Sequence, residues 1–323
     1  MTISVLLLFI IGLALISFGA NMLVTSTENI SEKYNISYFL SSFIFIGLAT
    51  SSPEIFISAI SSLNGKSNIA IGNALGSNIT NISLVLALSY LLLKKDILPI
   101  NKNIDRETYG FIFFLIIISV LLIPLLSDGL LLLNEAILLI TVFSTLVFLY
   151  KKFFYQYNHH WQKDISSSHS NGLRIIFTLV FGLSILLIGT EIFLSSSISL
   201  AKYFSVSDYV IGLSITAIGT SIPELASSIE SVRKKNVEFI VGNILGSNIF
   251  NFTVAMSAAG LLSLNQEPLF IEDLLRDMFM ILITMIGFYI IIKNYNYIAT
   301  KITCMLLLSF FVVYQISLYG ISI

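Results

Sequence analysis

The chain has 323 residues, of which 56% are hydrophobic and only 11% are charged, and its mean hydropathy is +0.93. Charged residues make up about 25% of a typical soluble domain, so this composition excludes a soluble globular protein and a disordered chain. The net charge of -1 provides no field that would attract nucleic acid, and we expect no such partner. Long apolar runs separated by short polar loops instead predict a polytopic helical protein in a lipid bilayer.

A helix that crosses a bilayer needs about 20 mostly apolar residues. Ten stretches meet this requirement, which predicts an all-α membrane protein with ten transmembrane helices. Their approximate ranges are 3–26, 38–63, 69–93, 108–127, 129–150, 173–197, 208–232, 239–263, 275–292 and 299–321.

The longest polar stretch, residues 151–172, is predicted to be a flexible cytoplasmic linker. It separates a first half of five spans, residues 1–150, from a second half of five spans, residues 173–323. The three histidines of the chain, His159, His160 and His169, lie in this linker. A metal site at these histidines is the less favoured interpretation.

The positions of lysine and arginine predict the orientation, because cytoplasmic loops carry an excess of positive residues. With ten spans, 14 of the 17 lysines and arginines fall on one side of the membrane. Only Lys66, Lys202 and Arg276 fall on the other side. This distribution predicts a multi-pass protein of the cell membrane with both termini extracellular.

The sequence contains an internal repeat. Residues Gly47–Asn81 align without a gap with residues Ala217–Asn251, and 14 of the 35 positions are identical at a constant offset of 170. Because each copy of the repeat has five spans, an odd number, the two copies enter the membrane from opposite sides. The predicted architecture is therefore two inverted five-helix repeats, an arrangement common among secondary transporters.

Glu54 and Glu224 occupy matching positions in the repeat, and each lies inside an apolar span. A charged side chain at bilayer depth costs several kcal/mol, so it indicates a functional site unless a base neutralises it. No lysine or arginine lies in the interior of any predicted span. The two glutamates are therefore our first candidates for an ion-binding site.

A proline precedes each glutamate. Pro53 and Pro223 cannot donate a backbone hydrogen bond, so both helices should kink or unwind just before the carboxylates. Helical spacing places a polar set on the same face as each glutamate. The first set is Gly47, Thr50, Ser51, Glu54 and Ser58, and the second is Ala217, Thr220, Ser221, Glu224 and Ser228.

The spans that follow supply a second polar wall. Asn73, Ser77 and Asn81 recur every four residues in span 3, and Asn243, Ser247 and Asn251 repeat the pattern in span 8. G-x-x-x-G steps at Gly72 and Gly76, and at Gly242 and Gly246, should let helix backbones approach closely. Carboxylate, amide, hydroxyl and carbonyl oxygens are ligands for hard cations such as Ca²⁺ and Na⁺, not for soft transition metals.

These residues resemble the alpha-repeats of the cation/Ca²⁺ exchanger superfamily, and most closely those of prokaryotic sodium/calcium exchangers. The resemblance rests on ATSSPE and GNALGSNITN in the first half, and on GTSIPE and GNILGSNIFN in the second. It implies an antiporter without a cofactor that exchanges Na⁺ for Ca²⁺ by alternating access, and a functional monomer.

The resemblance also implies a role for each residue. Ca²⁺ would bind to the carboxylates of Glu54 and Glu224 and to the backbone carbonyls of Thr50 and Thr220. Na⁺ would bind at Gly47, Ser51, Ser77, Ala217, Ser221 and Ser247 together with the two glutamates. Asn81 and Asn251 would complete the centre, directly or through water, with Asn73 and Asn243 beside them. Some members carry Asp where this chain has Asn251, which leaves one protonatable group fewer.

Other functions remain open at this stage. Ca²⁺/H⁺ exchange or a K⁺-dependent exchange could use the same scaffold and the same glutamates. A cation channel is less favoured, although mirrored carboxylates could form a selectivity site. We do not expect an enzyme, since no histidine or lysine lies within a span to act as an acid or base.

Overall fold

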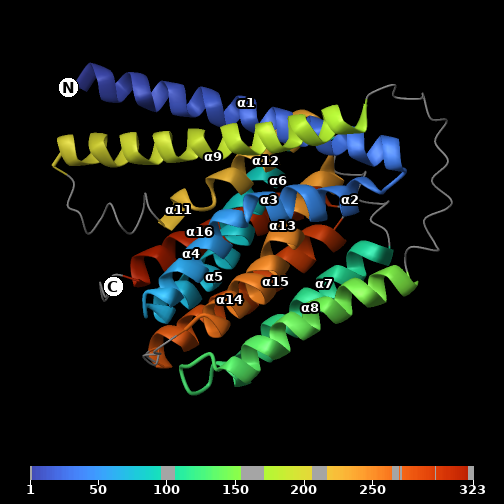
Figure 1. The fold of residues 1–323 in the computed structure, drawn as a ribbon, viewed down its shortest axis with the longest axis vertical. Coiled ribbons are helices and arrows are strands. Elements are labelled where there is room, and N and C mark those ends of the chain that lie inside the picture. The colour runs from blue at the N-terminus through green and yellow to red at the C-terminus, as the bar shows by residue number, and fades with distance from the viewer. Residues whose placement is uncertain are drawn as a thin grey trace.

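The computed structural model describes residues 2–95, 106–153, 171–205, 217–263, 269, 271–294 and 296–318. Within these residues every regular element is a helix (Figure 1). The first half contains α1 (Thr2–Tyr34), α2 (Tyr38–Ser41), η1 (Ser42–Gly47), α3 (Leu48–Thr50), α4 (Ser52–Leu63), α5 (Ser67–Thr80), η2 (Asn81–Leu86), α6 (Ala87–Leu92), α7 (Arg106–Leu125) and α8 (Leu133–Phe153). The second half contains α9 (Gly172–Tyr203), α11 (Ala217–Gly219), α12 (Ile222–Arg233), α13 (Val237–Phe250), η6 (Asn251–Ala255), α14 (Met256–Leu261), α15 (Ile271–Lys293) and α16 (Tyr297–Ser317).

The helices agree with a membrane protein that crosses the bilayer many times. Seven described helices are long and apolar enough to span it, and a helix pair bent by 41°, Tyr38–Thr50 with Ser52–Leu63, can be counted as an eighth. Within the predicted span 129–150, Leu133–Leu149 is an apolar helix of shorter length. The predicted span 208–232 begins outside the described residues. The count of ten spans therefore stays a prediction.

Large apolar side chains cover the outside of the bundle. Phe56, Phe113, Phe148, Phe177 and Phe279 are each more than 60% exposed. A soluble protein seldom exposes so wide an apolar surface, whereas lipid solvates it without cost. The described residues thus form a multi-pass membrane protein.

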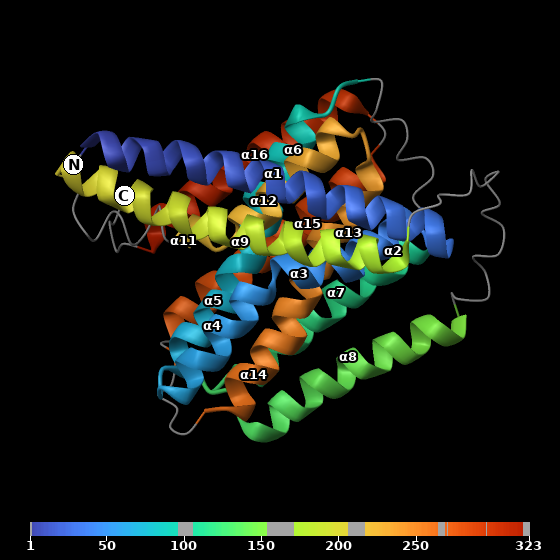
Figure 2. The ribbon, with the colours of Figure 1, turned by 45° about the horizontal axis from the view of Figure 1, so that its top comes forward.

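Helices α1 and α9 lie side by side, antiparallel, across one face of the bundle (Figures 1 and 2). Glycines allow their close contact. A Cβ atom on Gly12 would lie 2.7 Å from the backbone of Phe193, and one on Gly19 would lie 2.5 Å from the backbone of Leu186. Neither glycine position has room for a side chain, because real Cβ contacts are essentially never below 3.0 Å. Gly182 and Gly189 of α9 follow Gly12 and Gly19 by the repeat offset of 170 residues, and they pack equally closely on α1.

One end of α1 is also attached to the site-bearing part of the bundle. Lys234 follows α12, and its ammonium group lies 2.5 Å from the carboxylate of Glu28 and 2.8 Å from the hydroxyl of Thr25, both on α1. All three side chains are partly buried in this contact. The ion pair therefore links the α1–α9 pair to the helix that carries Glu224.

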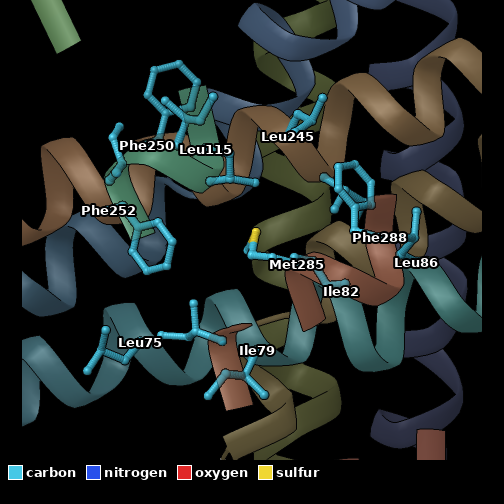
Figure 3. Close-up of a cluster of buried hydrophobic side chains, with 14 of the residues drawn as sticks. Leu75, Ile79, Ile82, Leu86, Leu115, Leu245, Phe250, Phe252, Met285 and Phe288 are labelled. Carbon is cyan, nitrogen blue, oxygen red and sulfur yellow. The ribbon is translucent and has the colours of Figure 1, made fainter. Parts of the chain in front are cut away.

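The core lies between the remaining helices. Figure 3 shows side chains of α5, η2, α7, α13, η6 and α15 gathered in one cluster. The labelled residues are Leu75, Ile79, Ile82, Leu86, Leu115, Leu245, Phe250, Phe252, Met285 and Phe288. This packing holds α5 and α13, the helices with the asparagine stripes, next to each other.

The end of α6 is capped by a lysine from α16. The ammonium group of Lys301 donates to the carbonyl oxygens of Tyr90 (2.9 Å), Leu91 (2.5 Å) and Leu93 (2.9 Å). These carbonyls have no donor within their own helix, because the last turn of a helix leaves its acceptors free. Lys301 thus satisfies the end of the span that begins at α5.

We expect Lys301→Met to lower the stability of the purified protein by about 2 kcal/mol, since hydrogen bonds to charged groups contribute about 1.5–3 kcal/mol. The measurement is thermal unfolding in detergent. Lys66→Met changes an exposed lysine at the other end of the same span and serves as the control, with an expected melting temperature equal to that of the wild type. Equal melting of the two variants would show that the cap does not contribute.

Candidate ion-binding site

Both helices that carry a glutamate are broken just before it. In the first half α3 ends at Thr50 and α4 begins at Ser52, while in the second half α11 ends at Gly219 and α12 begins at Ile222. Each glutamate lies in the first turn of the second segment. Pro53 and Pro223 each lie at the start of the segment that follows the break.

The carbonyl that Pro53 frees is satisfied by the protein itself. The hydroxyl of Ser52 donates to the carbonyl oxygen of Ala49 at 2.7 Å. The matching position in the second half is Ile222, which has no hydroxyl. The two breaks therefore differ in how their backbone is held, although their prolines match.

The carboxyl groups of Glu54 and Glu224 are completely buried. None of their four oxygen atoms has a hydrogen-bond partner among the described residues. The two carboxyls are close enough to interact electrostatically. Burial of unpaired carboxylates is costly, and a bound cation would remove that cost by neutralising both.

Hydroxyl groups surround the two carboxyls. Ser77 lies near the carboxyl of Glu54, whereas Thr50, Ser51 and Ser247 lie near the carboxyl of Glu224. Like the carboxylate oxygens, the buried hydroxyl oxygens of Ser51 and Ser221 have no hydrogen-bond partner within the described ranges. The site therefore presents several unsatisfied oxygen atoms within a small volume.

Asn73 and Asn243 hold the backbone of the two glutamates. The side-chain amide of Asn73 donates to the carbonyl oxygen of Glu54 at 3.3 Å, and that of Asn243 donates to the carbonyl oxygen of Glu224 at 3.2 Å. Asn243 also donates to the hydroxyls of Ser227 and Ser228. The same contact thus recurs at the repeat offset, and it fixes each glutamate relative to the helix that follows.

Thr50 connects the first broken helix to α13. Its hydroxyl lies 3.3 Å from the amide oxygen of Asn243 and 3.3 Å from the hydroxyl of Ser247. The hydroxyl of Ser247 also donates to the carbonyl oxygen of Gly47 at 3.3 Å. Residues of the two halves of the chain therefore share one hydrogen-bonded cluster.

The glycine steps behave differently in the two halves. Added Cβ atoms on Gly242 and Gly246 would meet the backbone oxygens of Phe39 and Phe43 at 2.4 and 2.5 Å, so α13 packs tightly on α2 and η1. Gly72 and Gly76 have no described atom within 4 Å of such a Cβ, and Gly72 is exposed. The prediction of close packing is therefore confirmed for Gly242 and Gly246. With respect to the described residues it is wrong for Gly72 and Gly76.

Four buried asparagines lie on α5, η2, α13 and η6. Asn81 and Asn251, both predicted, begin the wider π-helical turns η2 and η6, which occur often at functional sites. Asn78 and Asn248 are also fully buried there, and Asn81 donates to the amide oxygen of Asn248 at 3.1 Å. We did not predict Asn248, whose identity with Asn78 at the repeat offset was a usable signal.

The structure brings most of the predicted residues together. Thr220 is half-buried where Thr50 is buried, and α11 begins at Ala217, whose side chain lies outside the described part. The three histidines of the linker also lie outside it.

In the described ranges no group of three or more His, Cys, Asp or Glu side chains could hold a metal ion. The candidate site therefore consists of oxygen atoms from two carboxylates, hydroxyls, amides and broken-helix carbonyls.

A bundle of apolar helices with two buried glutamates at helix breaks defines a multi-pass transporter of cations. The profile of the family described as sodium/calcium exchanger protein matches residues 4–151 and again residues 174–320. The chain belongs to this family. Its members are secondary transporters of Na⁺ and Ca²⁺, which are substrates, and they are neither enzymes nor dependent on a cofactor. This chain is accordingly a cation/Ca²⁺ antiporter.

Individual relatives agree with this assignment. The chain is 32% identical to the putative antiporter CaxA of Alkalimonas amylolytica, over 79% of each chain. It is 28% identical to the sodium/calcium exchanger MaX1 of Methanosarcina acetivorans, over 79% of this chain and 82% of that protein. Among solved structures, the sodium-calcium exchanger NCX_Mj soaked with 10 mM Na⁺ is similar with a TM-score of 0.75 and 27% identity, over 98% of this chain and all of that one.

Proposed function

We propose that this protein exchanges Na⁺ for Ca²⁺ across the cytoplasmic membrane by alternating access. The observation that carries the proposal is the pair of buried carboxyls, whose four oxygens have no hydrogen-bond partner in the described part of the chain. Two carboxylates neutralise one Ca²⁺, which takes about 6–8 oxygen ligands. The same oxygens could serve Na⁺ once Ca²⁺ has left, so the two ions would exclude each other.

In the proposed Ca²⁺ site the carboxylates of Glu54 and Glu224 bind the ion together with the backbone carbonyls of Thr50 and Thr220. These carbonyls lie at the C-terminal ends of the short segments before each break, where the helix dipole favours a cation. The two glutamates thus approach the ion from opposite halves of the chain.

The proposed Na⁺ sites lie beside the Ca²⁺ site and share its glutamates. Ser51 and Ser221 have buried hydroxyls for which the described residues provide no partner, and Ser77 and Ser247 lie beside the carboxyls. The backbone at Gly47 and Ala217 would supply further oxygens. Asn81 and Asn251 complete the centre, while Asn73 and Asn243 hold the glutamate backbones instead of binding ions directly.

We further propose that the protein works as a monomer built of two inverted five-helix repeats, residues 1–150 and 173–323, joined by the linker 151–172. The double match of the family profile supports this division. The distribution of lysine and arginine supports extracellular termini.

The test is uptake of ⁴⁵Ca²⁺ into proteoliposomes loaded with Na⁺, K⁺ or choline, each with and without a pH gradient. We expect uptake only from Na⁺-loaded vesicles and no effect of the pH gradient. Uptake that depends on the pH gradient and not on Na⁺ would show that the protein exchanges H⁺, instead of Na⁺, for Ca²⁺. A requirement for K⁺ together with Na⁺ would place the protein with K⁺-dependent exchangers.

A further inference from the structure

The four buried asparagines form two pairs that are related by the repeat. The first pair is Asn81 with Asn248, and the second is Asn251 with Asn78. All four side chains are fully buried. Helix α12, which carries Glu224, packs against η2, which begins at Asn81, and α4, which carries Glu54, packs against η6, which begins at Asn251. Each pair therefore lies beside one of the glutamate helices.

Among the described residues, a hydrogen bond joins only the first pair. The amide nitrogen of Asn81 donates to the amide oxygen of Asn248 at 3.1 Å. The amide oxygen of Asn81 remains buried and has no hydrogen-bond partner among the described residues. An amide has one donating end and one accepting end, so a bond that engages the nitrogen determines where the oxygen points.

We propose that Asn248 is a positioning residue, which holds the amide of Asn81 so that its oxygen is presented to the transported ion. This inference rests on the proposed function of the site. Asn248 does not touch the ion itself, since its oxygen is engaged by Asn81. It acts by pre-orienting a ligand, which reduces the cost of ordering that ligand when the ion binds.

The second pair provides the contrast. Both amide atoms of Asn78 and both of Asn251 are buried, and among the described residues they have no hydrogen-bond partner. Asn78 therefore does not orient Asn251 in this structure, although it stands at the position equivalent to Asn248. The repeat makes Asn78 a matched control of the same residue type, burial and repeat position.

The experiment replaces Asn248 by leucine, which has a similar size and cannot accept a hydrogen bond. Equilibrium binding of ⁴⁵Ca²⁺ to the purified full-length protein and Na⁺-driven ⁴⁵Ca²⁺ uptake are both measured. We expect Asn248→Leu to raise the half-saturating Ca²⁺ concentration about tenfold, as is typical when the support of a ligand is lost. The maximal uptake rate should stay within twofold of the wild type, and Asn78→Leu should change the half-saturating concentration much less.

A double-mutant cycle with Asn81→Ala separates positioning from general packing. If Asn248 acts through Asn81, then adding Asn248→Leu to Asn81→Ala weakens Ca²⁺ binding no further, and the two effects are non-additive. Additive effects, equal effects of Asn248→Leu and Asn78→Leu, or unchanged Ca²⁺ binding would overturn the inference. If the leucine variant does not fold, Asn248→Ala repeats the test without added bulk.

Failure of the proposed function gives a different result. In that case the wild-type protein itself shows no binding of ⁴⁵Ca²⁺ or no Na⁺-driven uptake. If the wild type binds and exchanges Ca²⁺ but Asn248→Leu matches it, only the positioning role is wrong.

Discussion

Glu54→Gln and Glu224→Gln are each expected to reduce Na⁺-driven ⁴⁵Ca²⁺ uptake by at least about 100-fold. Mutation of a group that only supports a metal ligand lowers metal affinity or activity by about 10–100-fold. These carboxylates are the proposed ligands themselves, so the effect should be larger. Glutamine keeps the size and one oxygen but removes the charge that neutralises Ca²⁺. Uptake is measured in proteoliposomes loaded with Na⁺.

The same variants should not be less stable than the wild type. Each removes a buried carboxylate that no described residue pairs with, and removal of an unpaired buried charge is neutral or stabilising. Melting in detergent without Ca²⁺ should therefore occur at an equal or a higher temperature. Loss of uptake combined with a lower melting temperature would point to misfolding, and normal uptake in both single variants would exclude these glutamates as the ion ligands.

Glu230→Gln is the matched control for the two site variants. Glu230 lies on the same helix as Glu224 and is also buried, but its carboxylate is paired with Arg233 at 3.0 Å. We expect this variant to keep the uptake activity. The comparison distinguishes a glutamate of the site from a buried glutamate that is already neutralised by a base.

Gly242→Ala and Gly246→Ala are expected to destabilise the protein strongly. The added Cβ atoms would lie 2.4 Å and 2.5 Å from the backbone oxygens of Phe39 and Phe43. Overpacking costs about 1–3 kcal/mol and occasionally more, and backbone atoms cannot rotate away as a side chain can. We expect a loss near the upper end of this range in thermal unfolding of the purified protein.

Gly72→Ala and Gly76→Ala provide the matched control from the first half. No described atom lies within 4 Å of their added Cβ atoms. Alanine is favoured over glycine inside a helix by about 0.8–1.0 kcal/mol, so these variants should melt at the same temperature or slightly higher. If all four alanine variants melted at the same temperature, the tight packing of α13 on α2 and η1 would not be what makes Gly242 and Gly246 intolerant of a side chain.

Much of the protein can be predicted from its sequence because the membrane imposes strict rules. Only apolar helices satisfy their backbone groups in lipid, so the spans follow from hydropathy. Pro53 and Pro223 lack a backbone donor, so the helix breaks follow from their positions. Glu54 and Glu224 are recognised because an unpaired acid in an apolar span has no structural reason to be there.

The sequence by itself determined the class of protein, most of the candidate polar residues and the repeated motifs of the two halves. It could not reveal how equivalent residues come to differ. Gly72 matches Gly242, and Asn78 matches Asn248, yet in each pair only the second residue makes the close contact. Such differences depend on how the two halves pack against each other in one conformation. Identical motifs carry no information about that packing, so only the tertiary structure could decide it.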